Sequence, residues 1–379
     1  MKKRSLPILL VGIPEQNADL EYAGGFRAPD PVVLLCRRGH RYLVVSELEE
    51  GRAQRVAEAR SGNDTVEVLT PRKLGLKGAR RSRLANWVSE LLRRERVTKV
   101  RVPAVFPHGV AKTLEKRGFR LSIARGALFP ERRVKTREEQ KQIKESQQAA
   151  VIAMRAAVAQ IGAAAIEHSG LLTIKGKVLT SEAVSGTITR TLLAHDCFCG
   201  ETIVAGGLQA ADPHEIGSGP LRAHEAIVLD IFPRHMRHGY WGDLSRTVIR
   251  GKPSPKLKKM YQAVKAAHAA ALTRVKPGVK CATVHNAAEE VFKKRRYTTE
   301  VENGRATGFI HSTGHGVGLA IHEGPSVGPG DDRLRSGNVI TIEPGLYYPD
   351  IGGIRIEDTI VVTRDGWRYL VPCEKHFEV

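Results

Sequence analysis

Cysteine and aromatic residues are both scarce in this chain of 379 residues. The cysteines are odd in number and scattered, without a Cys-x-x-Cys pair, at Cys36, Cys197, Cys199, Cys281 and Cys373. This pattern excludes a disulfide scaffold and a zinc ribbon, and it favours the reducing cytoplasm as the compartment. Aromatic residues make up 5% of the chain, so we do not expect a surface on which nucleic-acid bases stack.

Long apolar runs are missing as well. No stretch reaches the roughly 18 apolar residues that a membrane-spanning helix needs. The sequence opens with MKKRSLPILLVGIPEQ, in which Pro7 and Gly12 bound a short apolar run and no small-residue cleavage site follows. We therefore expect a first β-strand here rather than a signal peptide, and no association with a membrane.

Positive charge is the main excess, with a net charge of +20. Residues 1–133 hold 28 Lys and Arg against 14 Asp and Glu, which gives +14 of that total. An anionic partner such as RNA would explain the excess, and so would a solvated basic surface. Because no nucleic-acid-binding motif accompanies the charge, we expect the solvated surface and no nucleic-acid partner. RNA or ribosome binding through this region stays the alternative.

The length and the composition predict two domains. Residues 1–133 alternate short apolar runs with basic, helix-like segments, and residues 31–46 predict two strands around a turn. A small α/β domain therefore fits residues 1–133. The composition changes at about Arg132, and a long amphipathic helix follows, with a capping box formed by Thr136 and Glu139. We place the second domain at residues 134–379.

Two aspartates mark the first candidate site. Asp230 ends an apolar strand, and Asp243 lies in the next predicted strand. A hairpin centred on Arg237 would place them nearly opposite each other, and like charges opposite one another destabilise a sheet. A cation between them removes that penalty. The alternative is that one aspartate faces solvent or caps a turn.

Two glutamates lie on comparable strands further along the chain. Period-two alternation in NVITIEPG places Thr341 and Glu343 on the face away from the isoleucines. The same alternation in GGIRIEDT places Arg355 and Glu357 on one face. Buried carboxylates are costly unless a cation or another partner accompanies them. A metal ion would serve, and an ion pair between Glu357 and Arg355 is the alternative.

Histidines complete the set. His315 lies between glycines, His311 precedes it by four residues, His322 follows it by seven, and His214 precedes Asp230 by sixteen. With two aspartates and two glutamates, such a donor set suits manganese, iron or cobalt, with zinc possible in principle. Four carboxylates carry too much charge for one ion, so we predict two divalent ions bridged by carboxylates and water.

The ordered Asp, Asp, His, Glu, Glu set, with IEPG and GIRIEDT around the glutamates, resembles the metallopeptidase family of methionine aminopeptidase, Xaa-Pro aminopeptidase and prolidase. This resemblance covers residues 136–379 and implies the pita-bread fold, an α+β catalytic domain in which helices cover a curved antiparallel sheet. Residues 1–133 resemble the α/β N-terminal domain of the proline-directed members, the creatinase and prolidase type. The implied metal ligands are Asp230, Asp243, His315, Glu343 and Glu357, with Asp243 and Glu357 bridging both ions.

The resemblance also implies a reaction. A metal-bridging hydroxide would hydrolyse the N-terminal Xaa-Pro bond of a peptide with proline at its second position, and Glu343 would shuttle the proton. His322 and His214 would bind the substrate or the tetrahedral intermediate, while His311 and Arg355 would shape the substrate side. We expect manganese, with cobalt, iron or zinc as alternatives, and a homodimer.

One feature departs from the family pattern. The two aspartates are thirteen residues apart, whereas the family spacing is usually eleven. An insertion of two residues preserves the alternation of the strands, so the metal site is expected to survive. The hairpin tip at residues 234–238 could contact substrate or a partner subunit instead. An amidohydrolase of the same fold, acting on another small amide, is therefore the alternative function within the family.

Overall fold

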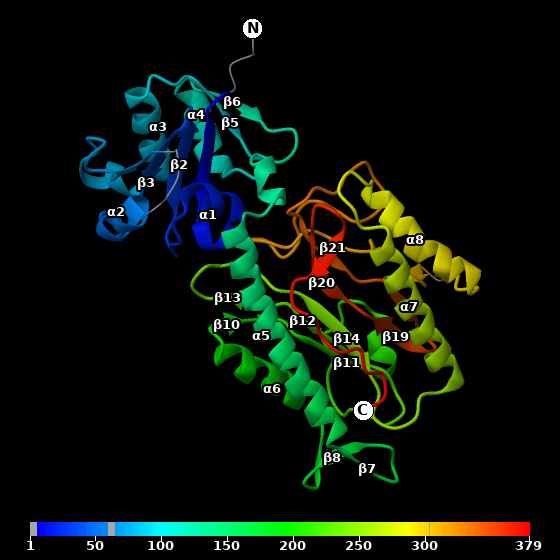
Figure 1. The fold of residues 1–379 in the computed structure, drawn as a ribbon. Coiled ribbons are helices and arrows are strands. Elements are labelled where there is room, and N and C mark those ends of the chain that lie inside the picture. The colour runs from blue at the N-terminus through cyan, green and yellow to red at the C-terminus, as the bar shows by residue number, and fades with distance from the viewer. Residues whose placement is uncertain (1–5, 60–64, 303) are drawn as a thin grey trace. The chain divides into compact units, whose positions relative to one another are not determined.

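The structure, a computed structural model, describes residues 6–59, 65–302 and 304–379. The chain divides into two compact units, Met1–Arg132 and Arg133–Val379 (Figure 1). Each unit has its own apolar clusters of buried side chains. Among the described residues, no helix combines the length and the apolarity that crossing a lipid bilayer requires.

The first unit is built on one mixed sheet. Its strands are β1 (Ile8–Gly12), β2 (Val32–Arg37), β3 (His40–Val44), β4 (Thr65–Leu69), β5 (Lys99–Val102) and β6 (Arg120–Ile123). They lie in the order β4-β3-β2-β1-β5-β6. The pairs β1–β2 and β2–β3 are antiparallel, whereas β3–β4, β1–β5 and β5–β6 are parallel. The two strands predicted within residues 31–46 are β2 and β3.

Helices cover both faces of this sheet. They are α1 (Ala18–Gly24), α2 (Glu50–Ala59), α3 (Leu84–Arg94) and α4 (His108–Lys116). Side chains alternate along β1, so Leu9 packs in the cluster that holds Leu91 of α3, while Leu10 packs in the cluster that holds Leu20 of α1. Both faces of the sheet are therefore buried, and the predicted α/β architecture is confirmed.

Two helix pairs organise the second unit (Figure 1). They are α5 (Arg137–Gly162) with α6 (Ser181–Leu193), and α7 (Pro255–Thr273) with α8 (Cys281–Lys294). The side chain of Thr136 accepts a hydrogen bond from the backbone of Glu139, and the Glu139 side chain accepts one from the backbone of Thr136. This is the capping box that the sequence predicts, and it sets the start of the long helix.

The strands of the second unit that carry the candidate site form three sheets. They are β11 (Ile203–Gly206), β12 (Ile227–Ile231) and β14 (Leu244–Val248); β17 (Val339–Ile342), β20 (Asp358–Val362) and β21 (Trp367–Tyr369); and β18 (Gly345–Tyr348) with β19 (Gly352–Arg355). All pairs within them are antiparallel. Residues 354–362, which the sequence predicts as one strand, are divided between β19 and β20.

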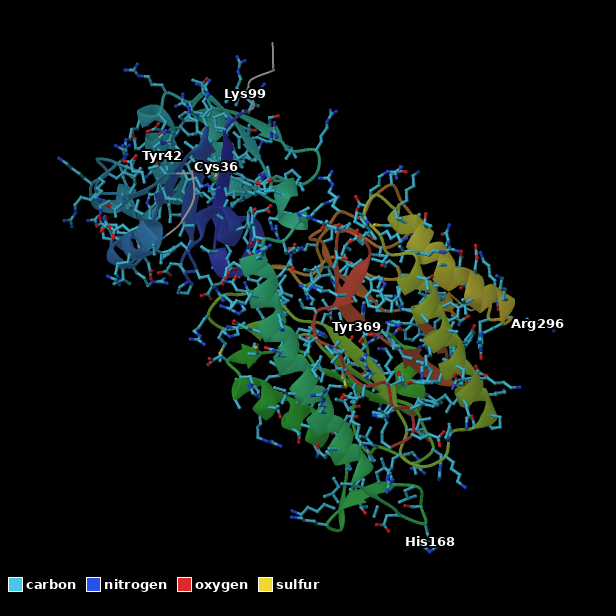
Figure 2. All side chains as sticks on the ribbon, viewed as in Figure 1. Cys36, Tyr42, Lys99, His168, Arg296 and Tyr369 are labelled. Atoms are coloured by element: carbon cyan, nitrogen blue, oxygen red, sulfur yellow. The ribbon has the colours of Figure 1, made fainter. Side chains whose placement is uncertain are left out.

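Smaller elements complete this unit. They are β7 (Ala165–Ile166), β8 (Leu172–Ile174), β9 (Lys177–Val178), β10 (Cys197–Phe198), β13 (Arg234–His235), β15 (Glu300–Glu302) and β16 (Arg305–Thr307). A short 3-10 helix lies at Gly207–Ala211, and others lie at Pro14–Gln16 and Gly78–Ser82 in the first unit and at Pro130–Arg133 where the two units join in the sequence. In Figure 2, Tyr369 of β21 lies toward the middle of the second unit, and Arg296 lies at the outer end of α8.

Each helix pair packs on its own strands. Apolar residues of α5 and α6 share a buried cluster with β12 and β14, for example Met154 with Leu229. Apolar residues of α7 and α8 share another with β17 and β20, for example Val264 with Ile340. The helices therefore cover one side of these strands, and the predicted carboxylate ligands lie on the other side.

Candidate metal centre

Three of the predicted ligands already form a compact group. Asp243, His315 and Glu357 each offer a ligand atom, and these atoms lie within 4.8 Å of one another. Asp243 and Glu357 are buried. Asp243 lies directly before β14, Glu357 lies at the break between β19 and β20, and His315 comes from the glycine-rich segment before β17. Residues distant in sequence therefore meet at one point.

The other two predicted ligands lie in the same cavity, whose volume of about 840 Å³ is that of a small-molecule site. Glu343 follows β17, and its Oε1 lies 3.1 Å from Nε2 of His315. Asp230 ends β12, and its Oδ2 accepts a 2.7 Å hydrogen bond from Arg355. The other carboxylate oxygen of Asp230, Oδ1, is buried and has no hydrogen-bond partner among the described residues. That orphaned oxygen is an available ligand atom.

The hairpin places both aspartates on one side of the sheet. Asp230 pairs with Ser245 in the β12–β14 ladder, so Asp243 lies diagonally from Asp230, two residues before its partner. From the sequence we expect the two aspartates nearly opposite each other, and the observed register differs from that by two residues. A shift of two residues keeps the same face, and both carboxylates therefore reach the cavity.

Close backbone packing positions His315. A Cβ on Gly314 would collide with the backbone oxygen of Thr341, so glycine lets the segment lie against β17. The His315 backbone N–H donates to the Thr341 side chain at 3.0 Å, and the Thr341 hydroxyl donates to Glu343 at 3.0 Å. One threonine thus fixes a histidine and a glutamate of the group together.

The electrostatics show a surplus of negative charge. Burial, and then the neighbouring carboxylates, raise the pKa values of Asp243 and Glu357 well above their usual range. Burial also acts to raise the pKa of Glu343, but the hydrogen bond from His315 and nearby positive charges outweigh it and lower that pKa to about 2. The four predicted carboxylate ligands share this cavity with two arginines, and both arginines are already paired, Arg355 with Asp230 and Arg133 with Asp332. Divalent cations fit such a set of carboxylates.

The remaining predicted residues line the same cavity. Nε2 of His311 lies 3.1 Å from the Tyr347 hydroxyl. Burial lowers the pKa of His311. The ring of His322 meets that of His315 edge-on, with centroids 4.3 Å apart. His214 is exposed at the cavity. Arg355 is buried and donates to Asp230 and, at 2.8 Å, to the Tyr347 hydroxyl. All nine residues predicted for the site, the five metal ligands with His214, His311, His322 and Arg355, therefore line one cavity.

Some residues that support the site were not predicted from the sequence. Gln147 of α5 is buried and holds the Asp243 backbone with two hydrogen bonds, of 2.7 Å and 2.9 Å. Its polar side chain on the apolar face of α5 is the signal that could have found it. Ser245 donates to Glu357 at 2.9 Å. Tyr347 and Arg133 also belong to the surroundings, and nothing local in the sequence distinguishes them.

A second group of possible ligands lies at the hairpin tip. Glu145, His235 and His238 have ligand atoms within 4.8 Å of one another. The two imidazole rings are stacked, with centroids 3.8 Å apart and planes 15° apart. The lone pair of an imidazole nitrogen lies in the plane of its ring. Because these two rings are nearly parallel, their lone pairs do not point toward one common ion. This geometry does not favour chelation.

Replacing Glu357 with glutamine tests the need for cations. In the metal-free protein, Glu357→Gln should leave the melting temperature equal or higher, because it removes a buried negative charge. At a hundredfold excess of Mn²⁺ over its Kd, the wild type should gain about 5–10 °C, and the variant should lose most of that gain. Differential scanning calorimetry measures both. The exposed Glu138→Gln variant serves as the control, and an equal gain in Glu357→Gln would contradict the assignment.

Comparison with known proteins gives a consistent result. The model of metallopeptidase family M24 matches residues 141–364. An Xaa-Pro dipeptidase of Pyrococcus furiosus is 37% identical over 177 residues, covering 46% of this chain and 48% of that protein. An Xaa-Pro dipeptidase of Lactobacillus helveticus is 35% identical over 211 residues, covering 53% of this chain and 53% of that protein. These matches span about half the length of the curated relatives.

Solved structures match nearly the whole chain. A prolidase from Pyrococcus horikoshii OT3 has a TM-score of 0.78 and 26% identity, covering 97% of this chain and 94% of that one. An Xaa-Pro dipeptidase from Bacillus anthracis has a TM-score of 0.80 at 23% identity, covering 98% and 95%, and shows the fold alone. The predicted pita-bread fold is confirmed. The chain belongs to metallopeptidase family M24.

Proposed function

We propose that this protein is a metal-dependent peptidase that hydrolyses the bond before proline in Xaa-Pro substrates. The observation that carries the proposal is the convergence of four carboxylates and His315 in one cavity of a family M24 member. Two of the similar proteins are named Xaa-Pro dipeptidase. The bond before proline has a leaving nitrogen without hydrogen, so the site needs no acceptor for an amide proton there.

We assign the metal ligands to five side chains, Asp230, Asp243, His315, Glu343 and Glu357. Their combined charge suits two divalent ions, and their oxygen-rich composition suits manganese, with cobalt, iron or zinc as alternatives. Asp243 and Glu357 would be shared by the two ions, as the family resemblance implies, and both side chains are buried. When bound, such ions supply an activated water at neutral pH and polarise the substrate carbonyl.

Glu343 is the residue that we assign to proton transfer. Its carboxylate is ionised at pH 7 and lies in the cavity beside the other predicted ligands, so it would be in reach of a proton of the attacking water. It would return that proton to the leaving nitrogen. Thr341 donates to its Oε1 and thereby fixes the orientation of the carboxylate.

The histidines and Arg355 act on the substrate side. Burial and the neighbouring His315 lower the pKa of His322, so that its ring is neutral at pH 7 and can donate a hydrogen bond to a substrate oxygen. His214 would do the same from the exposed edge. His311 and Arg355 both contact the Tyr347 hydroxyl, and they would hold this wall of the cavity in place.

Arg133 favours a dipeptide as the substrate. It lines the same cavity, and its guanidinium lies 2.7 Å from Asp332. Arg355 is already bonded to Asp230, Tyr347 and Ser245, whereas Arg133 is half-buried with donors left over for a second carboxylate. The free carboxylate of an Xaa-Pro dipeptide would bind there, and a longer peptide would carry a neutral amide at that position.

An amidohydrolase acting on another small amide is the second candidate. The thirteen-residue spacing of Asp230 and Asp243 favours it, because the extra residues change the hairpin tip beside the ligands. Faster turnover of small non-peptide amides than of Xaa-Pro dipeptides, under the same manganese loading, would establish it. The homodimer and the cytoplasmic location stay predictions.

The variant Glu343→Gln tests the proton-transfer role. Glutamine cannot accept the proton, so kcat for an Xaa-Pro dipeptide should fall about 10²–10⁴-fold. Metal content measured on the same samples separates lost chemistry from lost ions. Glu138→Gln, an exposed position on α5, should retain full activity. A Glu343→Gln enzyme with nearly unchanged kcat would remove the assignment.

The variant Arg133→Leu tests the choice of a dipeptide. Loss of the ion pair with the substrate carboxylate should raise KM for an Xaa-Pro dipeptide by about tenfold, with a smaller effect on kcat. The same dipeptide with an amidated C-terminus should show no change. Arg333→Leu is the control, since Arg333 follows Asp332, the partner of Arg133, but does not line the cavity. Equal losses on both substrates would show that Arg133 does not bind the carboxylate.

A further inference from the structure

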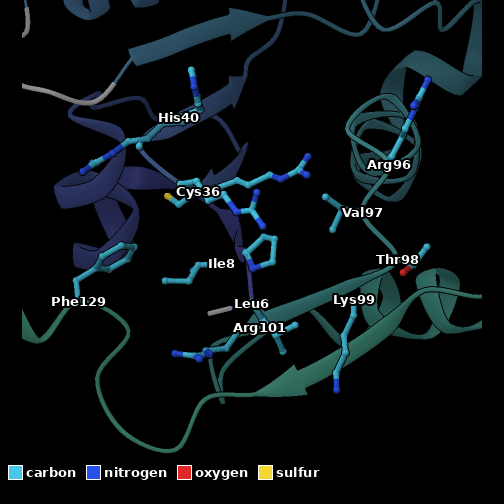
Figure 3. Close-up of a pocket in the computed structure, with 15 residues that line it drawn as sticks. Leu6, Ile8, Cys36, His40, Arg96, Val97, Thr98, Lys99, Arg101 and Phe129 are labelled. Atoms are coloured by element: carbon cyan, nitrogen blue, oxygen red, sulfur yellow. The ribbon is translucent and has the colours of Figure 1, made fainter. Parts of the chain in front are cut away.

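A second cavity lies in the first unit, apart from the residues assigned to catalysis. It has a volume of about 420 Å³ and sits at one end of the sheet (Figure 3). Its wall is formed by the starts of β1 and β5, the turn between β2 and β3, and the segment that follows α3. Ile8 and Val97 lie on opposite sides in Figure 3, so part of the lining is apolar.

Positive charge dominates the lining of this cavity. The basic residues along it are Arg37, Arg38, His40, Arg41, Arg96, Lys99 and Arg101. No aspartate or glutamate is among the described residues that line it. Like charges gathered around one opening repel each other, and a bound anion relieves that repulsion.

Several of these cations have no protein partner. Arg37 donates to the backbone oxygen of Glu95 at 2.6 Å. The side chains of Arg38, Arg96, Lys99 and Arg101 form no hydrogen bond or ion pair with any residue in the described part of the chain. Some other arginines of the unit do have partners, as Arg94 does with Glu67 at 2.6 Å. Four cations are therefore available to a ligand.

The backbone adds an independent observation. Arg38 has φ 48° in the two-residue turn between β2 and β3, a position that favours asparagine or glycine. Arg96 has φ 51° just after α3, where a helix-ending turn favours glycine. Other non-glycine residues share this conformation, including Lys175 and Arg296. What distinguishes Arg38 and Arg96 is that both line the same cavity.

We propose that this cavity binds a compact anion with two or more linked phosphate groups. Its volume is that of a small-molecule site, and its cations come from separate segments, which suits several charges spread along one ligand. Arg38, Arg96 and Lys99 are exposed, so their side chains can turn over the opening. A nucleic-acid strand is less favoured, because its bases would need aromatic side chains to stack on, and Phe129 is the one such benzene-type ring among the described lining residues.

Two sources share this chemistry, free inorganic oligophosphate and a nucleoside polyphosphate. Isothermal titration calorimetry on the full chain, at low salt, distinguishes them with inorganic triphosphate, ATP and orthophosphate. Triphosphate should bind more tightly than orthophosphate, and the affinity should fall as salt is added. Tighter binding of ATP than of triphosphate would assign the apolar lining to the nucleoside. Equal affinities would assign the site to the phosphates alone, and both results support an oligophosphate site.

The test variant is the double substitution Arg38→Asn and Arg96→Gly. Asparagine and glycine suit the left-handed backbone at these positions, so thermal unfolding should show a fold that is equally or more stable. The Kd for triphosphate should rise about tenfold or more, because two charge-assisted contacts are lost. The control is Lys116→Gln on α4, an exposed cation that does not line the cavity.

Three results would overturn the proposal. The first is no binding of triphosphate by the wild type at low salt. The second is an equal loss of affinity in Lys116→Gln, which would mean that the net charge, and not the cavity, attracts the anion. The third is a single-stranded RNA that binds the wild type and that triphosphate does not displace, which would assign the basic surface to a nucleic acid.

Discussion

The placement of four carboxylates around one histidine is the constraint on which the second unit depends. Burial of negative charge is unfavourable, and it becomes more so as further carboxylates are added nearby. Arg355 compensates for part of that charge through its bond to Asp230. In the described part of the chain no arginine or lysine is ion-paired with Asp243 or Glu357, His315 lies 3.5 Å from Asp243, and burial raises the pKa values of both carboxyl groups. A polypeptide that folds in this way needs cations from outside.

Rigid support keeps these side chains in place. The buried Arg246 donates to the backbone oxygen of Glu357 and, at 2.7 Å, to Asp358. Asp358 also lies 2.6 Å from Lys375. These contacts tie the break between β19 and β20 to β14, which carries Ser245 beside Glu357. These contacts hold the metal-binding side chains near their final positions before an ion binds, so that the ion does not have to draw them together.

Much of the site could be predicted because its signals are local. Alternation along a strand identified the faces of Glu343 and Glu357, and the capping box identified the start of α5. Other features arise only from tertiary packing. Division of residues 354–362 between β19 and β20 follows from pairing with two different strands, β18 and β17. The place of Arg133 in the wall of the cavity likewise depends on packing between segments remote in sequence, which no periodicity reveals.

Anomalous diffraction from crystals soaked in manganese tests the central claim most directly. It locates the ions without relying on activity. The account predicts two manganese positions within coordination distance of Asp230, Asp243, His315, Glu343 and Glu357, with Asp243 and Glu357 shared by both. Crystals that bind no manganese at these side chains, or bind it only elsewhere on the chain, would contradict it.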